Sequence, residues 1–184
     1  MKNTVSVSRF KTIAIGATLL IVAAFIFPAY TRHSSKGEHM TIEQNKVTAR
    51  RWSEELWGKS NLAAADEIIA PNYVRHDPGD PFPARGPEDV KRIVMMLRTM
   101  LPDFRIQVEA MVAEGDYVVS RYTTTATDTK GYMGNPATGR SIRTSAMQMF
   151  KFENGKIVES WAVRDDLGTL RQLGLLPAEG PPQN

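Results

Sequence analysis

The sequence predicts an α+β fold, in which a curved, mostly antiparallel sheet wraps around helices that precede it in the chain. Residues 41–101 contain apolar side chains at helical spacing, whereas residues 104–165 show the alternation and the β-branched composition of strands. Helices followed by a series of strands are typical of α+β domains. Such a sheet, folded over a helix, is expected to enclose a pocket between the two layers.

Three helices are expected before the sheet. The first begins at Thr41, where Gln44 completes a capping-box pattern, and it ends near residue 58. The second occupies residues 61–70 and is stopped by the proline that follows it. The third occupies residues 86–101, because a Gly-Pro pair suits the start of a helix and another proline follows its end.

Four strands and a last short helix are expected to follow. The strands are residues 104–112, 117–127, 141–153 and 156–165. The glycine-rich segment 128–140 is expected to be a loop. Asn154 and Gly155 predict a tight hairpin between the last two strands, since both turn positions need a positive φ. Gly174 is suited to end a helix at residues 167–173.

An uncharged, apolar segment at residues 12–31 precedes the domain and is expected to be a helix. Its 20 residues are just enough to span a membrane, and the basic residues before it favour a domain outside the cytoplasm. We therefore expect an exported or membrane-anchored protein; the alternative is a cytoplasmic protein whose translation starts at Met40. The expected parts are a signal peptide or signal-anchor at 1–31, a linker at 32–40, the domain at 41–176 and a disordered tail at 177–184.

Composition excludes several classes of site. The chain has no cysteine, which excludes disulfides, thiolate metal sites and cysteine nucleophiles. Of its three histidines only His76 lies in the expected domain, so a three-histidine metal site is excluded there. No P-loop, dinucleotide-binding glycine pattern or Gly-x-Ser-x-Gly motif occurs. We therefore expect no metal site, no phosphoryl transfer, no nicotinamide chemistry and no serine hydrolysis.

The net charge of +3 belongs to the N-terminal segment. Five of the 23 basic residues and one of the 20 acidic residues precede position 41, so the rest of the chain carries 18 basic and 19 acidic residues. Binding to a phosphate backbone needs an excess of basic side chains. We therefore expect no nucleic-acid partner.

Three segments of the domain form a recognisable set. They are PNYVRHDP at residues 71–78, GYMGNPATGR at residues 131–140 and FKFENGKIVESWAVRDDLGTLRQLG at residues 150–174. This set resembles the SnoaL-like polyketide cyclases, also called the ester cyclase family, of the NTF2-like superfamily. The resemblance covers most of residues 41–176, and it implies an NTF2-like cone and a homodimer.

The resemblance also implies a cofactor-free cyclase, since characterised members of the family close a polyketide ring by intramolecular aldol condensation. The aspartate of their C-terminal motif serves as general acid/base and matches Asp165. Many relatives carry a histidine before the glycine-rich loop, where this chain has Asp128. A mechanism that depends on that histidine is therefore not implied here.

Asp165 is also a candidate because of the strand pattern. Counting every second residue places Trp161, Val163 and Asp165 on one face of the last strand. If the apolar members of this face look into the cavity, Asp165 does too, and an apolar environment raises the pKa of a carboxyl group so that it becomes a better base. The alternative is that Asp165 or Asp166 caps the following helix.

The remaining candidates have structural alternatives as well. His76 is a possible second acid/base or hydrogen-bond donor, or else a loop histidine bonded to the backbone. The candidates for substrate binding are Trp161, Trp52, Arg121 and Tyr73. Core packing also accounts for a tryptophan such as Trp161, and ion pairing or solvation for Arg121.

We therefore expect a cofactor-free acid/base enzyme, a cyclase, isomerase or lyase, that acts on a small polyketide-like or other carbonyl compound. The expected partner is thus a small hydrophobic or carbonyl-containing molecule, with a membrane as a further partner if residues 12–31 are retained. The alternative is a non-catalytic module of the NTF2-like type, which binds a small molecule or another protein.

Overall fold

A computed structural model describes residues 36–132 and 134–177 of the 184-residue chain. The described part contains one five-stranded sheet with the strand order β1-β5-β4-β3-β2. The strands are β1 (Ile69–His76), β2 (Arg105–Glu114), β3 (Tyr117–Thr127), β4 (Ser141–Glu153) and β5 (Lys156–Arg164). Strands β2 to β5 form an antiparallel meander, and β1 pairs with β5 in parallel.

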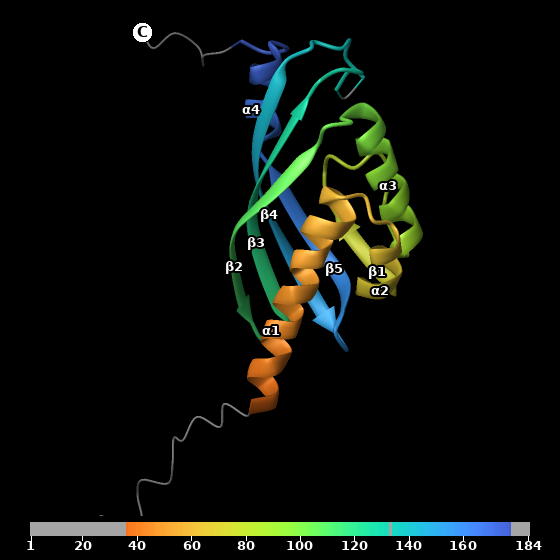
Figure 1. Cartoon of the computed structure of the whole chain (residues 1–184), viewed down its shortest axis with the longest axis vertical. Coiled ribbons are helices and arrows are strands. Elements are labelled where there is room, and N and C mark those ends of the chain that lie inside the picture. The colour runs from red at the N-terminus through yellow and green to blue at the C-terminus, as the bar shows by residue number, and fades with distance from the viewer. Residues whose placement is uncertain (1–35, 133, 178–184) are drawn as a thin grey trace, which may run out of the picture. The chain divides into compact units, whose positions relative to one another are not determined.

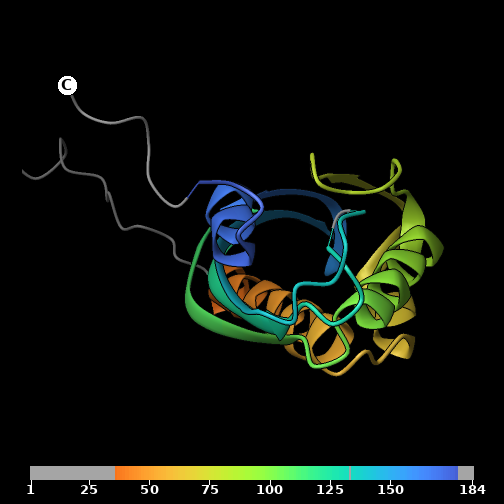
Figure 2. The same cartoon turned by 90° about the horizontal axis from the view of Figure 1, so that it is seen from above.

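The helices lie against the sheet and beside it (Figure 1). They are α1 (Lys36–Arg51), which continues into a π-helical segment η1 (Trp52–Gly58), then α2 (Ala63–Ile68), α3 (Gly86–Met100) and α4 (Asp166–Leu173). Seen from above, the strands bend around one side of the domain, while α3 and the segment after β1 lie on the other (Figure 2). The predicted α+β fold with a curved, mostly antiparallel sheet is therefore confirmed.

The concave face of the sheet is joined to η1 by an aromatic core. The Trp52 ring lies 5.6 Å from the Phe150 ring and 5.8 Å from the Tyr73 ring, measured between centroids. All three side chains are almost completely buried. Burial of each large apolar side chain contributes about 1.5–3 kcal/mol, so this contact fixes η1, and with it the adjacent Trp57, against β1 and β4.

Strand β1 was not expected. The second helix ends at Ile68 rather than at residue 70, because Ile69 already has extended backbone angles. Pro71 and Asn72 argue against a strand at this point of the sequence, since both residue types are unfavourable in a sheet. They are tolerated because the pairing with β5 is interrupted between Ile69 and Val74, and both are exposed there.

A β-bulge changes the phase of β5. Phe152 pairs with Ile157, but the preceding residue of β4, Lys151, pairs with Glu159, so β5 holds one additional residue at this point. Beyond the bulge Ser160 and Ala162 are buried and Val163 is exposed. The predicted alternation, with Trp161, Val163 and Asp165 facing inward, is therefore wrong.

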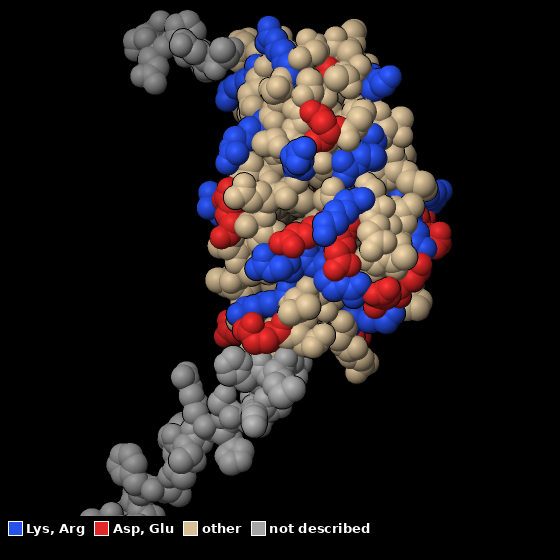
Figure 3. All heavy atoms as spheres, in the orientation of Figure 1, with Lys and Arg blue, Asp and Glu red and all other residues tan. Residues whose placement is uncertain are grey.

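The hairpin between β4 and β5 turns at Asn154 and Gly155, whose φ angles are 52° and 76°. The prediction of this turn is confirmed. The first helix begins at Lys36, inside the segment that was expected to be a linker. Basic and acidic side chains are intermixed on the face of the molecule seen in Figure 3.

Within residues 36–132 and 134–177, no helix is both long and apolar enough to cross a membrane. The membrane segment predicted at residues 12–31 lies outside the described residues. The same holds for the predicted tail from residue 178 onward.

Candidate functional site

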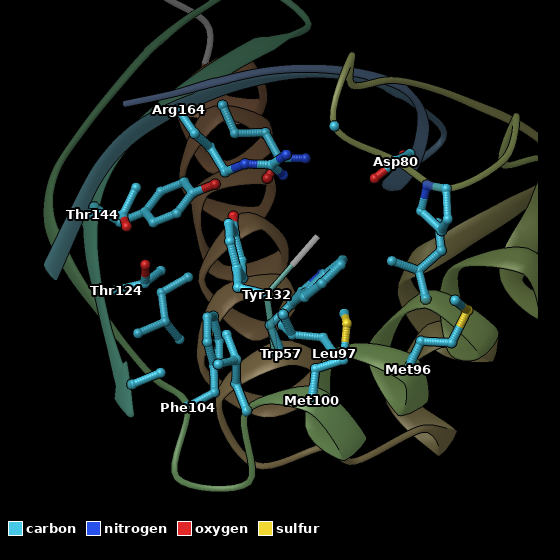
Figure 4. Close-up of a pocket in the computed structure, with 18 of the residues that line it drawn as sticks. Trp57, Asp80, Met96, Leu97, Met100, Phe104, Thr124, Tyr132, Thr144 and Arg164 are labelled. Carbon is cyan, nitrogen blue, oxygen red and sulfur yellow. The ribbon is translucent and has the colours of Figure 1, made fainter. Parts of the chain in front are cut away.

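A cavity of about 450 Å³ lies between the concave face of the sheet, α3 and the loop that follows β1. This volume is in the range typical of small-molecule sites. In Figure 4, Arg164 and Asp80 lie at one end of the cavity, and Met96, Leu97, Met100 and Phe104 lie at the other. The cavity therefore has a charged end and an apolar end.

The charged end is built around Asp77, whose side chain is only 2% exposed. Its Oδ2 accepts hydrogen bonds from Arg75 Nη2 at 2.6 Å and from Arg164 Nη1 at 2.7 Å. Arg75 also donates from Nε to Asp80 Oδ2 at 2.7 Å. Arg164 completes the cluster through a longer ion pair with Asp166 at 3.4 Å.

Local structure explains why these groups meet. Tyr73 and Arg75 alternate on the buried face of β1, and the β5 bulge turns Arg164 toward the same side. The loop after β1 folds back, since Arg75 N–H donates to Ala84 C=O at 3.1 Å. Gly79 donates its N–H to Asp77 Oδ1, and a Cβ at this position would collide with the Arg164 guanidinium. A side chain at position 79 would displace the Arg164 guanidinium, so glycine suits the point where the loop passes over Arg164.

Asp80 is the carboxylate on the cavity wall with the properties of a base. Its side chain is 8% exposed, and burial raises the pKa of Asp80 above its ordinary value of 3.8, with the nearby Arg75 only partly opposing this effect. Oδ2 is held by Arg75, whereas Oδ1 accepts no hydrogen bond from any residue that the structure describes. One carboxylate oxygen is thus fixed by the protein and the other is free to accept a proton.

Two tyrosines lie on the wall beside this cluster. Tyr122 comes from β3, and burial raises the pKa of its phenol, which therefore stays protonated at neutral pH. Tyr132 comes from the loop between β3 and β4, and burial, together with the Asp166 carboxylate, raises its pKa as well. Both phenols can therefore donate hydrogen bonds.

Asp128 organises the loop that carries Tyr132. Its carboxylate is fully buried and accepts hydrogen bonds from Gly131 N, Thr138 N and Thr138 Oγ1 at 2.8–2.9 Å. The family resemblance implies a histidine at this position. In this chain it has a structural role, because it closes the glycine-rich loop onto itself.

Asp165 does not line the cavity. It is exposed and serves as the N-cap of α4, where its Oδ1 accepts a hydrogen bond from Gly168 N at 2.8 Å. Gly168 allows this close approach, since a Cβ there would collide with the Asp165 carboxylate. The structural alternative considered for Asp165 is the one observed, and the inward-facing residue of this segment is Arg164.

His76 and Trp161 also lie away from the cavity. Their rings stack at 5.3 Å on the outer side of the sheet, and His76 Nε2 is 2.8 Å from Glu159 Oε1. Arg121 is exposed and pairs with Glu109 at 2.8 Å. None of these three residues lines the cavity, and their expected roles in a site stay predictions.

Trp52 and Tyr73 are placed differently from those residues. Trp52 lines the cavity and at the same time forms part of the core. Tyr73 lies behind the wall, where its hydroxyl is 2.6 Å from Ser160 Oγ. Gln148 Nε2 donates to the same Ser160 oxygen at 3.1 Å, and Gln148 lines the cavity.

The described residues include no group of three histidine, aspartate or glutamate side chains that could hold a metal ion. The acids at the charged end face arginines instead, and each of Asp77, Asp80 and Asp166 has an ion-pair partner. What this end offers a ligand is a carboxylate oxygen and several N–H and O–H donors.

Sequence reasoning did not find Arg75, Asp77, Asp80 and Arg164. The loop that contains two of them, DPGDPFPARGP, shows proline and acidic residues directly after a histidine, which indicates a structured turn but not its partners. Arg75 would have been selected if residues 69–76 had been taken as a strand, because a charged residue on a buried strand face needs a counter-charge. No comparable signal marks the β5 bulge.

The fold and the cavity define the class of this protein: an α+β domain whose curved sheet and helices enclose a cavity with paired acids and arginines at one end. A sequence model of the SnoaL-like polyketide cyclase family matches residues 47–173. The chain therefore belongs to this family.

Solved structures agree with this assignment. One, described as a candidate polyketide cyclase from Acidithiobacillus ferrooxidans, is 32% identical over 72% of this chain and 95% of that chain, with a TM-score of 0.65. IdmH, a candidate polyketide cyclase from Streptomyces antibioticus, is 29% identical over 71% and 99%, with a TM-score of 0.62. AclR, a candidate hydroxylase from Streptomyces galilaeus, is 25% identical over 76% and 90%, with a TM-score of 0.65. Among curated proteins, none matches this chain.

The capping role of Asp165 can be tested by two substitutions. Asp165→Ala removes the acceptor for Gly168 N and is expected to lower the free energy of unfolding by about 1 kcal/mol, whereas Asp165→Asn keeps an oxygen acceptor and is expected to change it little. Urea denaturation measures both. Equal unfolding midpoints for wild type and Asp165→Ala would show that the cap does not stabilise α4.

Proposed function

We propose that this domain is a cofactor-free acid/base enzyme, a cyclase, isomerase or lyase that acts on a small carbonyl compound of polyketide-like character. The observation that carries the proposal is the Asp80 carboxylate, which lies on the wall of a largely apolar cavity with one oxygen held by Arg75 and the other free. Family membership supports the same class of reaction.

Asp80 is assigned the role of the base. Its free Oδ1 removes a proton from a carbon next to the substrate carbonyl; the C–H electron pair forms a C=C bond, and the carbonyl π pair moves onto oxygen. In a cyclase the enolate carbon then attacks a second carbonyl of the same molecule. The new alkoxide takes the proton back from Asp80, so the reaction needs no other proton donor.

The cationic side chains at the charged end supply the electrostatic part of catalysis. Arg75 and Arg164 are held in place by Asp77, so they need not reorganise when negative charge develops on the substrate oxygen. The carboxylates that hold them also keep the end from being strongly positive. A neutral ketone is therefore better suited to this site than a permanent anion.

The base can be identified by proton exchange. The bicyclic ketone 2-tetralone is a suitable probe, and its α-proton exchange in D₂O is followed by ¹H NMR. Asp80→Asn is expected to lower the enzyme-dependent exchange rate by about 10²–10⁴-fold, since it removes a positioned base. Asp165→Asn is the matched control and is expected to leave the rate unchanged.

The reverse result, loss of exchange in Asp165→Asn with an active Asp80→Asn, would assign the base to Asp165 as the family resemblance implies. A wild-type chain that binds 2-tetralone without accelerating exchange would favour the alternative, a non-catalytic binding module.

The pH dependence follows from the environment of Asp80. The base must be ionised, so kcat/KM for exchange is expected to fall as the pH falls through the pKa of Asp80, and burial places this pKa above 3.8. The profile of exchange rate against pH in the wild type and in Asp165→Asn should show the same acid limb. An acid limb centred at or below 3.8 would contradict the assignment of a buried carboxylate as the base.

A further inference from the structure

The wall of the cavity contains a tyrosine, Tyr122, whose hydroxyl has no hydrogen-bond partner among the described residues. Tyr122 is 8% exposed and lines the cavity, and its hydroxyl forms no hydrogen bond with any residue of the described ranges. Arg75, Arg164 and Asp77 are the charged groups near enough to influence it. Strand register places Tyr122 in the same cross-strand row as Arg164, because Tyr122 of β3 pairs with Ala146 of β4 and Ala146 pairs with Arg164 of β5.

The Tyr122 hydroxyl is open to the cavity, since the enclosed side-chain atoms without a partner in the described ranges are Trp57 Nε1, Arg75 Nη1 and Ser120 Oγ. Enclosed hydroxyl groups, in contrast, normally have partners within the protein. The other buried tyrosine of the sheet region, Tyr73, follows this rule, because its hydroxyl is 2.6 Å from Ser160 Oγ. The Tyr73 hydroxyl is thus held by the protein, whereas the Tyr122 hydroxyl is available to a ligand atom in the cavity.

Two enclosed donor atoms near this wall also have no acceptor among the residues described. Arg75 Nη1 and Trp57 Nε1 are both buried and meet no acceptor within the part of the chain that the structure describes. The other two guanidinium nitrogens of Arg75 are occupied by Asp77 and Asp80, and the guanidinium carbon lies 5.0 Å from the centroid of the Trp57 ring. A ligand at this end of the cavity meets the Tyr122 hydroxyl as a donor and Asp80 Oδ1 as an acceptor, and a carbonyl oxygen with a neighbouring C–H suits both.

Charge and shape narrow the class of ligand. Two cations, Arg75 and Arg164, already face three carboxylates, so a ligand with a permanent negative charge is not required for neutrality. The opposite wall is apolar, with methionine, leucine, isoleucine and phenylalanine side chains. An apolar ring system with a single carbonyl oxygen satisfies both ends.

We propose that the cavity binds an enolisable, apolar cyclic or aryl ketone whose carbonyl oxygen accepts a hydrogen bond from the Tyr122 hydroxyl. This inference rests on the proposed acid/base function, for which it names the substrate class and the group that holds the reacting oxygen. When Asp80 removes the α-proton, the carbonyl π pair moves onto this oxygen, and the Tyr122 hydroxyl stabilises the charge that develops there.

The test compares two probes of similar shape in the full-length chain. The dissociation constants of 2-tetralone and of the hydrocarbon 2-methylnaphthalene are measured by equilibrium dialysis, and their ratio reports the preference for a carbonyl oxygen. Tyr122→Phe removes one hydroxyl and keeps the ring, so this preference is expected to fall by about three- to tenfold, while binding of the hydrocarbon stays the same.

Tyr73→Phe is the matched control, because it removes a buried hydroxyl that is already bonded to Ser160. It is expected to lower stability and to leave the preference for the ketone unchanged. In the exchange assay Tyr122→Phe is expected to lower kcat by about 10²–10³-fold with a smaller change in KM, since a donor to the developing oxyanion acts mainly in the transition state.

Failure of this inference is distinguishable from failure of the proposed function. An unchanged ketone preference in folded Tyr122→Phe protein would overturn the inference, whatever the activity of Asp80→Asn. Conversely, Asp80→Asn is expected to retain the preference even though it loses exchange, and full exchange activity in that variant would overturn only the assignment of the base.

Discussion

One carboxylate oxygen, Asp77 Oδ2, accepts hydrogen bonds from both Arg75 and Arg164, and the charged end of the cavity depends on this contact. It connects β1, β5 and the loop between β1 and α3, which are separate segments of the chain. Loss of one partner from a buried ion pair costs about 3–5 kcal/mol, because a charge is left without compensation. The loop that carries Asp80 is therefore attached to the sheet through the same groups that make the site polar.

The site combines this fixed charge network with groups that the protein leaves without partners. Asp80 keeps one oxygen free, and the Tyr122 hydroxyl faces the cavity without an acceptor. Placed in a cavity with an apolar opposite wall, a base and a donor of this kind are suited to removing a proton beside a carbonyl group. The chemistry proposed here thus needs only side chains of the described domain.

The sequence predicted the fold better than the site, for identifiable physical reasons. Asn154 and Gly155 fixed the last hairpin because their turn geometry is a local property, and helical spacing located α3. The parallel pairing of β1 with β5 depends on contacts between distant segments, and Pro71 concealed it. The bulge in β5 adds one residue without any local signal, and this single residue exchanges the positions of Arg164 and Asp165 relative to the cavity.

The most direct test of this account is a crystal structure of the protein with 2-tetralone bound. The account predicts that the ketone oxygen lies at hydrogen-bond distance, about 2.5–3.0 Å, from the Tyr122 hydroxyl, with an α-carbon facing Asp80 and the aromatic ring against α3. A ketone oxygen directed at the methionine and leucine side chains of α3, or a ligand bound beside Asp165 outside the cavity, would contradict it.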